Sequence, residues 1–500
     1  MDQLPDDVLV RVMSLLSEVA VLACRLVCKR FGGLALHPDV WRHRRASFGH
    51  GNICQCAVLR LAPCLRELVV DNWHKQRPSD GPRLTLFVAT CAVRELSLYV
   101  GAKEVQPAAR LIRQQQVAGR LRAVSVSFRS ARNKDAAAAD DALSLLLMSL
   151  ASTSGVKISL SVDVEGNLPK SSRLVEDGTV VPTLRKLSCH LRQATEHFLE
   201  SVLARHATTL EDVDLVPIPD SFYTPAPAAS PARLLAGMPN LRKLHCCLIP
   251  GLDGVAACES LRELRLTVMS SHKGIAANTA GAAELLRRAT QLRDVHVFDN
   301  QTHVLHDVEH HASRNNSIVE LIGGLTSCEG SQLESLYVEH EGGALARLQS
   351  LLEQALPSLP TLRRFKVNVA SQQLLSVITP DTNPSLRSLQ LYRHEIFELT
   401  RWICPHAMLH TNRLKDILSA NPSLHVELHS YVCSAGHPCG VCRRLPCRLS
   451  LENKLHKYKY VGVFAHPVGK CASPEDHASV GLWFHVSDLK HYNSCQSSCV

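Results

Sequence analysis

The chain has 500 residues, of which 45% are hydrophobic and 20% charged, so it can bury a large core and is not globally disordered. Its net charge of +9 comes from Lys and Arg spread along the chain, which does not indicate a nucleic-acid partner. The chain has no long uncharged apolar run, and its first seven residues include three Asp and no basic residue, so we expect no membrane span and no signal peptide. Nineteen Cys without a secretory signal indicate reduced thiols, and therefore a cytoplasmic and/or nuclear protein.

Residues 1–45 are expected to form a small three-helix module. Pro5 suits the first turn of a helix, where its missing N–H costs nothing. A second helical stretch over 21–30 is expected to end at Gly32, and a short third one carries Trp41. Apolar residues of the first helix recur every three or four positions, which is typical of a helix with one buried face: Leu9, Val12, Met13 and Leu16.

This module resembles an F-box in three segments: 4–9 with its Leu-Pro start, 26–31 with Val-Cys-Lys-Arg-Phe, and 38–41 with its closing Trp. The resemblance implies that the module binds the Skp-type adaptor of a cullin-RING ubiquitin ligase by apolar helix-in-groove packing. The candidate adaptor-binding residues are Leu4, Pro5, Leu9, Val12, Leu16, Leu22, Val27, Cys28 and Trp41. The alternative is that Val12, Leu22 and Trp41 only form the module's own core.

Residues 46–430 repeat the template Leu-x-x-Leu-x-Leu, usually with Arg after the first Leu, as in Leu241–Cys246. A further unit is expected over Val156–Leu160, and the spacing of about 30 residues is typical of a solenoid. The opening aliphatic residues of the units are Leu65, Val93, Leu121, Leu184, Leu210, Leu241, Leu261, Leu292, Leu333, Leu362, Leu386 and Leu424.

The fourth and sixth template positions alternate with polar residues, so each unit is expected to form a short strand that buries these two positions. Apolar helical stretches lie between the strands, at 142–150, 198–205, 282–288 and 345–355. Strand and helix alternating at this period predict a parallel sheet inside a curve and helices outside. The units resemble leucine-rich repeats of the cysteine-containing type. The predicted fold class is therefore α/β, a three-helix F-box followed by a leucine-rich-repeat solenoid. Cysteines such as Cys189, Cys246, Cys258 and Cys328 are expected to be packing residues.

The third, fifth and seventh template positions are expected to face the concave side of the sheet. Aromatic and basic side chains there are typical of interface hot spots, so we predict a target protein on the central and late strands. The alternative is that each is an ordinary exposed strand residue. The candidate target-binding residues are Tyr99, His190, His245, Arg265, His296, Phe298, Tyr337, Lys366 and Tyr392.

Residues 431–500 depart from the template and are interpreted as a Cys/His-rich cap or tail, with a terminal strand over 458–464. A Cys-x-x-Cys pair with a nearby His and Cys has the spacing of a structural zinc site: His437, Cys439, Cys442 and Cys447. The competing interpretation, which we prefer, is an irregular cap with free thiols and no cofactor.

No catalytic set appears in the sequence, because no Gly-rich phosphate loop follows a strand and no nucleophile elbow is present. We therefore predict a non-catalytic subunit that recognises substrate for an SCF-type (Skp adaptor–cullin–F-box) ubiquitin ligase. Two alternatives stay open at this point. One is a ligase-independent leucine-rich-repeat scaffold, and the other is a zinc-stabilised nucleic-acid-binding protein.

Overall fold

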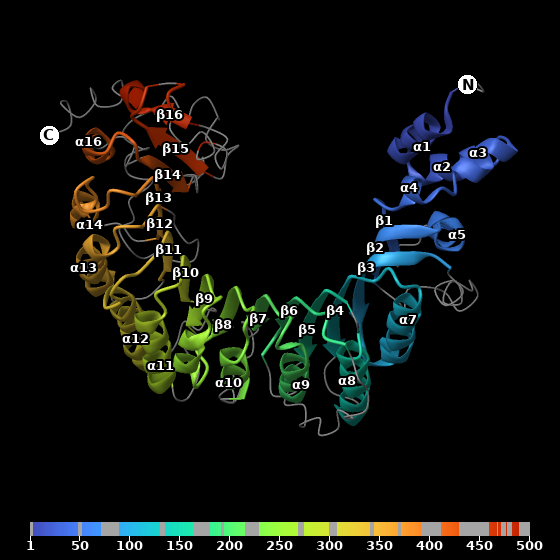
Figure 1. The fold of residues 1–500 in the computed structure, drawn as a ribbon, viewed down its shortest axis with the longest axis horizontal. Helices are drawn as coiled ribbons and strands as arrows, with labels where there is room; N and C mark the ends of the chain where they lie inside the picture. Colours follow the sequence, from blue (N-terminus) through green and yellow to red (C-terminus); the bar gives the residue numbers. More distant parts are fainter. Residues whose placement is uncertain are drawn as a thin grey trace. The chain divides into compact units, whose positions relative to one another are not determined.

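The computed structural model divides into two compact units, residues 1–242 and residues 243–500. In each unit the helices that follow the strands cover one face of a sheet (Figure 1). None of the described helices combines the length and apolarity that a membrane span needs. The structure describes residues 4–48, 53–71, 90–130, 136–153, 155–164, 181–191, 195–215, 230–268, 275–299, 308–340, 345–368, 372–391, 412–429, 460–467, 469–471, 477 and 483–489.

The first unit begins with four short helices, α1 (Asp6–Leu15), α2 (Glu18–Cys24), α3 (Lys29–Leu34) and α4 (Pro38–Trp41). The prediction of three helices is wrong because the second expected helix splits at Cys28. This residue has an extended backbone, and its Sγ accepts a hydrogen bond from the Phe31 amide at 3.5 Å, which caps α3. Gly32 consequently lies inside α3 and does not end a helix.

Seven strands of the first unit pair in parallel and in chain order. They are β1 (Arg45–Phe48), β2 (Cys64–Val70), β3 (Ala92–Val100), β4 (Ala123–Ser130), β5 (Lys157–Val164), β6 (Lys186–Cys189) and β7 (Asp212–Leu215). Strand β5 confirms the extra unit expected over Val156–Leu160. The unpredicted β1 continues directly from the helical module into the sheet. The helices are α5 (Ile53–Leu61), η2 (Ala102–Glu104), α7 (Val105–Val117), α8 (Ala136–Ala151), α9 (Glu196–His206) and α10 (Ser230–Ala236).

The second unit repeats the same order of strand and helix. Its parallel strands are β8 (Lys243–Cys247), β9 (Glu263–Val268), β10 (Asp294–Asp299), β11 (Ser335–Glu339), β12 (Arg364–Val367), β13 (Ser388–Leu391) and β14 (His425–His429). Strand β15 (Tyr460–Phe464) then pairs antiparallel with β14, and β16 (Trp483–His485) pairs parallel with β15. The helices are η4 (Leu252–Ala257), α11 (Ile275–Arg288), α12 (Val308–Thr326), α13 (Leu345–Ala355), η5 (Leu356–Ser358), α14 (Gln372–Val377), α16 (Asn412–Ala420) and η8 (Val486–Leu489).

The core of each unit lies between the sheet and the helices, and the template positions fill it. Leu264 and Leu266 of β9, at the fourth and sixth positions, are fully buried. This alternation of buried and accessible residues recurs in the other short strands. The mixed α/β fold is therefore solenoid-like, as the strand and helix spacing predicts.

The last parallel strand departs from the predicted register by one residue. His425 pairs with Ser388, which stands at the third template position, so Val426 and Leu428 point to the core. Leu424 is buried, and its amide bonds to the carbonyl of Asn421 as that of Leu386 bonds to Asn383, so it is the opening aliphatic residue as predicted and the shift of one residue lies after it. The shift places His425 on the sheet face that is opposite the helices.

The cysteines of the array are packed as expected. Cys189, Cys246, Cys258 and Cys328 are all buried. Burial raises the pKa of the Cys189 thiol to about 12, with a smaller contribution from the nearby Asp214 carboxylate. A buried thiol with a raised pKa is unreactive, so these side chains act as small apolar groups.

Candidate interaction surfaces

The N-terminal helices are held together by two buried polar side chains. Trp41 is fully buried, and its Nε1 donates a hydrogen bond to the carbonyl of Ala35 at 2.6 Å. The Arg44 guanidinium lies 5.4 Å from the centre of the Trp41 ring and donates to the carbonyls of Val40 at 2.7 Å and Met13 at 2.9 Å. These bonds tie the end of α1 to α4.

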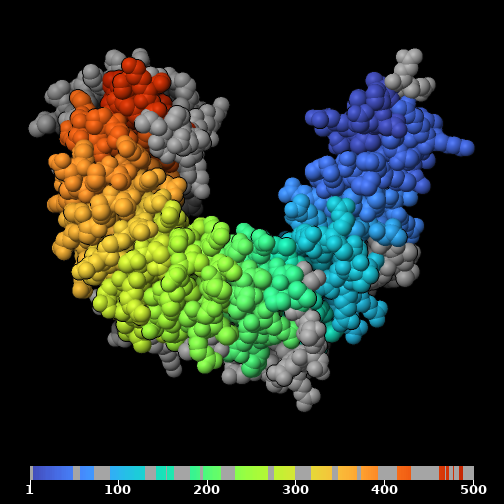
Figure 2. All heavy atoms as spheres, in the orientation of Figure 1, coloured from blue at the N-terminus to red at the C-terminus, as the bar shows by residue number. Residues whose placement is uncertain are grey.

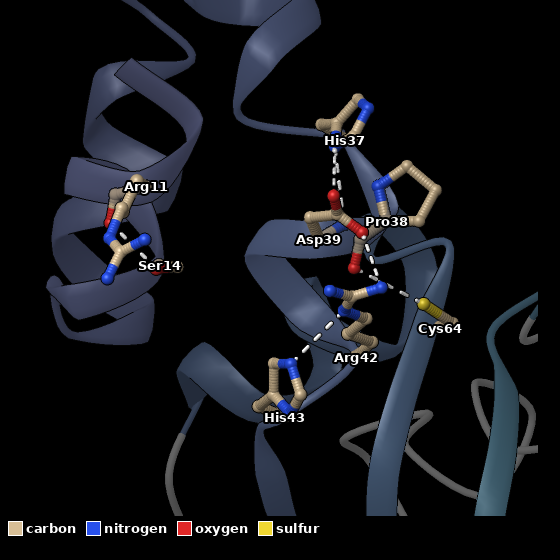
Figure 3. Close-up of polar contacts among 8 residues, drawn as sticks. All are labelled: Arg11, Ser14, His37, Pro38, Asp39, Arg42, His43 and Cys64. Atoms are coloured by element: carbon tan, nitrogen blue, oxygen red, sulfur yellow. Dashed lines mark hydrogen bonds and ion pairs between the residues drawn. The ribbon is translucent and has the colours of Figure 1, made fainter. Parts of the chain in front are cut away.

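The same helices are also anchored to the sheet of the first unit (Figure 3). The Cys64 thiol at the start of β2 donates to the carbonyl of Pro38 at 3.6 Å, and the His37 ring nitrogen Nδ1 accepts from the Asp39 amide at 3.3 Å. Arg42 closes this turn through an ion pair with Asp39 at 3.1 Å. The last helix of the module, α4, is therefore attached to the start of β2.

A set of large aliphatic side chains on these helices is exposed. We name it the N-terminal apolar patch, and it consists of Leu4, Val8, Val12, Leu15, Val19, Leu26 and Val27. Leu15 and Leu26 are the most exposed of them, at 83% and 85%. Arg30 of α3 holds the start of the chain, because it donates to the carbonyl of Leu4 and pairs with Asp6 at 2.6 Å. In Figure 2 these helices project from the end of the first unit.

The predicted adaptor-binding residues divide into two groups. Leu4, Val12 and Val27 belong to the N-terminal apolar patch, Pro5 and Cys28 are exposed, and Leu16 and Leu22 are half-buried. Leu9 and Trp41 are buried at 3% and 0% exposure, so they belong to the core of the module and not to the exposed patch. Sequence reasoning missed Val8, Leu15, Val19 and Leu26, although Leu26 stands next to the predicted Val27.

Residues 1–47 match the family model of F-box-like domains. The N-terminal module is F-box-like. A domain of this kind supports binding of a Skp-type adaptor in general. No curated protein matches the chain.

The second surface lies on the strands of the second unit, on the face opposite the helices. Equivalent positions of neighbouring strands are in register there, so their side chains form one row. We name it the open-face row, and it consists of His245, Arg265, His296, Tyr337, Lys366, Gln390 and Glu427.

The centre of the open-face row is aromatic and basic. The Tyr337 ring makes edge-to-face contacts with His296 at 5.3 Å and with Phe298 at 4.9 Å between ring centroids. The Lys366 ammonium lies 4.5 Å from the centre of the same Tyr337 ring. Aromatic pairs of this geometry and a cation over a ring each add stabilisation beyond their buried area. The Tyr337 ring is therefore in contact with aromatic and basic neighbours on both adjacent strands.

Charged groups beside the row set its electrostatics. Glu263 pairs with Lys243 at 2.5 Å and with Arg265 at 2.6 Å. Burial opposes ionisation of Glu263, but these two cations outweigh it and lower its pKa. Burial, together with the Arg265 and Lys366 charges, lowers the pKa of His296 to about 4. His296 is therefore neutral at pH 7, and Arg265 and Lys366 carry the positive charge of the row.

The structure brings together six of the predicted target-binding residues: His245, Arg265, His296, Phe298, Tyr337 and Lys366. Tyr99 and His190 lie in the first unit, and Tyr392 lies outside the described residues. Sequence reasoning missed Gln390 and Glu427, which hydrogen-bond to each other at 2.7 Å. Gln390 stands at the fifth template position and could have been predicted from the sequence. Glu427 could not, because the template places it at the fourth, buried position and the register of β14 is shifted by one residue.

The equivalent row in the first unit consists mostly of serines. Its register positions on β1 to β7 carry Ser47, Val69, Ser97, Ser125, Ser159, Ser188 and Asp214. Large aromatic and basic residues at this template position are thus a property of the second unit.

The predicted zinc ligands His437, Cys439, Cys442 and Cys447 lie outside the described residues. A different group of metal-ligating side chains occurs within the described part of the tail. His425, His466, Cys471 and His477 place one ligand atom each within 4.8 Å of all the others.

Proposed function

We propose that this protein is the target-recognition subunit of an SCF-type ubiquitin ligase. The N-terminal apolar patch binds a Skp-type adaptor, which links the chain to a cullin-RING ligase. The array, which we propose to be of the leucine-rich-repeat type, holds a target protein on the open-face row. The chain itself is non-catalytic and contributes proximity and orientation for ubiquitin transfer in the cytoplasm and/or nucleus.

The observation that carries this proposal is the position of the N-terminal apolar patch inside the segment that matches F-box-like domains. Soluble proteins seldom expose clustered large aliphatic side chains without a partner. All seven patch residues precede α3, and each is at least 40% exposed. An adaptor that covers them removes this apolar surface from water, which favours association.

The open-face row supports target binding by its chemistry. Tyr and Arg are enriched among residues that dominate interface energies, and rigid aromatic side chains lose little entropy on binding. Lys366 adds positive charge over the Tyr337 ring, and Arg265 adds a second one beside His296. We therefore expect a target segment that carries acidic residues beside an apolar side chain.

Affinity purification of the tagged full-length chain tests both parts. We expect Val12→Asp/Val27→Asp to lose the adaptor and the cullin but to keep the targets. Both side chains are exposed, so the variant is expected to fold, and circular dichroism of the purified chain checks this. Wild-type recovery of the adaptor by this variant would contradict the proposal.

The complementary variant is Arg265→Glu/Lys366→Glu, with Arg287→Glu on α11 as the charge-reversal control. We expect the double variant to keep the adaptor and to lose the targets, and the control to keep both. If the wild-type chain recovers targets but neither adaptor nor cullin, the protein is a ligase-independent scaffold and the proposal is wrong.

A further inference from the structure

Four metal-ligating side chains from separate segments converge beside the last parallel strand. His425 begins β14, His466 and Cys471 follow the antiparallel strand β15, and His477 precedes β16. The Nε2 atom of His425 lies 3.0 Å from that of His477 and 3.1 Å from that of His466, and 3.3 Å from the Cys471 Sγ. The Nε2 atoms of His466 and His477 are 3.3 Å apart.

These separations are close to those of ligands around one tetrahedral metal ion. Zinc binds imidazole nitrogen at about 2.0–2.1 Å and thiolate sulfur at about 2.3 Å, and tetrahedral angles then place the nitrogens about 3.3 Å apart and nitrogen and sulfur about 3.6 Å apart. The observed distances between the histidine nitrogens, 3.0 to 3.3 Å, match the first of these values within 0.3 Å. The four side chains already have the arrangement that the ion requires.

The hydrogen-bond partners of two rings show which of their nitrogens can bind a metal. The His425 Nδ1 lies 3.1 Å from the carbonyl of Arg387, and the His466 Nδ1 lies 3.2 Å from the carbonyl of Pro467. A carbonyl oxygen only accepts, so each Nδ1 carries the proton and, in the neutral ring, each Nε2 carries a lone pair. Metal-binding histidines are typically oriented in this way by a backbone carbonyl.

The two lone pairs that result point at each other. His425 and His466 face through Nε2 atoms 3.1 Å apart, although neither neutral nitrogen can donate to the other. His425 is only 2% exposed, so water does not separate the rings. A cation bound by both Nε2 atoms replaces this repulsion with attraction.

Aromatic side chains enclose the group. The Phe464 ring stacks on His466 at 4.6 Å between centroids, and the Trp483 ring packs against His477 at 4.6 Å. Trp483 also fixes the His477 backbone, because its Nε1 donates to the carbonyl of His477 at 2.8 Å. Gly462 has no side chain, and this makes room for the Trp483 indole ring, because a Cβ at this position would overlap the ring. These rings shield His425, which is buried, whereas the other three ligands are half-buried.

We infer that His425, His466, Cys471 and His477 bind one structural zinc ion. Four protein ligands leave no open position on a tetrahedral ion, which is typical of structural rather than catalytic zinc, and mixed imidazole and thiolate ligands suit zinc. Binding displaces the Cys471 thiol proton to solvent, since the thiolate is the ligand. The ion joins the C-terminal segment to the last repeat strand. This inference is independent of the proposed function.

The zinc content of the purified full-length chain tests the site. We expect His477→Ala and Cys471→Ser each to hold one zinc ion per chain fewer than the wild type by elemental analysis. His485→Gln is the matched control, because this neighbouring histidine is bonded to Ser487 and Ala465 and lies outside the group. Equal zinc content in the wild type and both ligand variants would overturn the inference.

A second measurement does not depend on the folding of a variant. The wild-type chain, stripped of metal and titrated with Co²⁺, is expected to develop the visible bands of tetrahedral cobalt with a thiolate-to-cobalt charge-transfer band. The thermal midpoint is expected to rise with added Zn²⁺, because the ion binds only the folded arrangement. Absence of tetrahedral bands together with an unchanged midpoint would exclude the site.

Discussion

Truncation of the two most exposed patch residues, Leu15→Ala/Leu26→Ala, tests the adaptor surface quantitatively. Each leucine loses three carbon groups, worth about 0.8 kcal/mol apiece when buried. The two side chains are 83% and 85% exposed in the free chain, so most of this value can be gained only in a complex. We expect the pair to weaken adaptor binding by about 4 kcal/mol, which is nearly a thousandfold in Kd.

The assay is a calorimetric titration of the full-length chain with a purified Skp-type adaptor. Val117→Ala is the matched control, because Val117 is 89% exposed on α7 of the same unit but lies outside the N-terminal apolar patch. All three chains are expected to unfold at the same temperature, since exposed truncations change stability by less than about 0.5 kcal/mol. A loss of less than fivefold in Kd for the double variant would refute the reasoning.

Three further predictions concern stability. Gly324→Ala should destabilise the second unit by about 1–3 kcal/mol in thermal unfolding, because its Cβ would lie 2.4 Å from the carbonyl oxygen of Ala283, whereas Gly323→Ala, with open space around it, should not. Arg44→Met should cost about 2–4 kcal/mol in urea unfolding, because it leaves buried carbonyls of the F-box-like module without their donor. The folded chain holds the pKa of His296 at about 4 against an ordinary 6.5, so the unfolded chain takes up the proton first as pH falls. Wild-type stability should therefore fall between pH 6.5 and 4, by up to about 1.4 kcal/mol per pH unit, relative to His296→Gln in unfolding at matched pH values.

The strands of the array could be predicted from the sequence because the template shows both where each strand recurs along the chain and which of its residues are buried. Aliphatic residues at two template positions alternate with polar ones, and this alternation fits only a strand with one buried face. Strand β1 could not be predicted in this way, since Arg45–Phe48 lacks the template. Its place is fixed by pairing with β2, a contact between residues more than twenty positions apart.

The adaptor surface was only partly predictable because helical periodicity does not say which stripe faces the rest of the module. Leu9 and Val12 lie on adjacent turns of α1, yet one is buried and the other is 47% exposed. What separates them is the position of α4, which Trp41 and Arg44 fix through bonds to Ala35 and Met13. Those bonds depend on tertiary packing, which no local pattern reports.

The His and Cys group at β14 was unpredictable from short spacings for a similar reason. Its members lie 41, 46 and 52 residues after His425, so a search for Cys-x-x-Cys selects other residues of the tail. The antiparallel return of β15 creates the group, because it pairs His425 with Phe464 and carries His466 back beside the repeat strand.

This arrangement also accounts for the end of the array. A parallel strand without a neighbour presents unpaired backbone groups to other chains, so a solenoid needs a cap on its last repeat. Strand β15 supplies the missing hydrogen bonds to β14, but a five-residue strand holds its position weakly alone. His425 on β14 and His466 just after β15 bind the same ion in the proposed site, so the ion holds the two strands together. Metal removal is therefore expected to release the cap before it affects the strands that carry the open-face row.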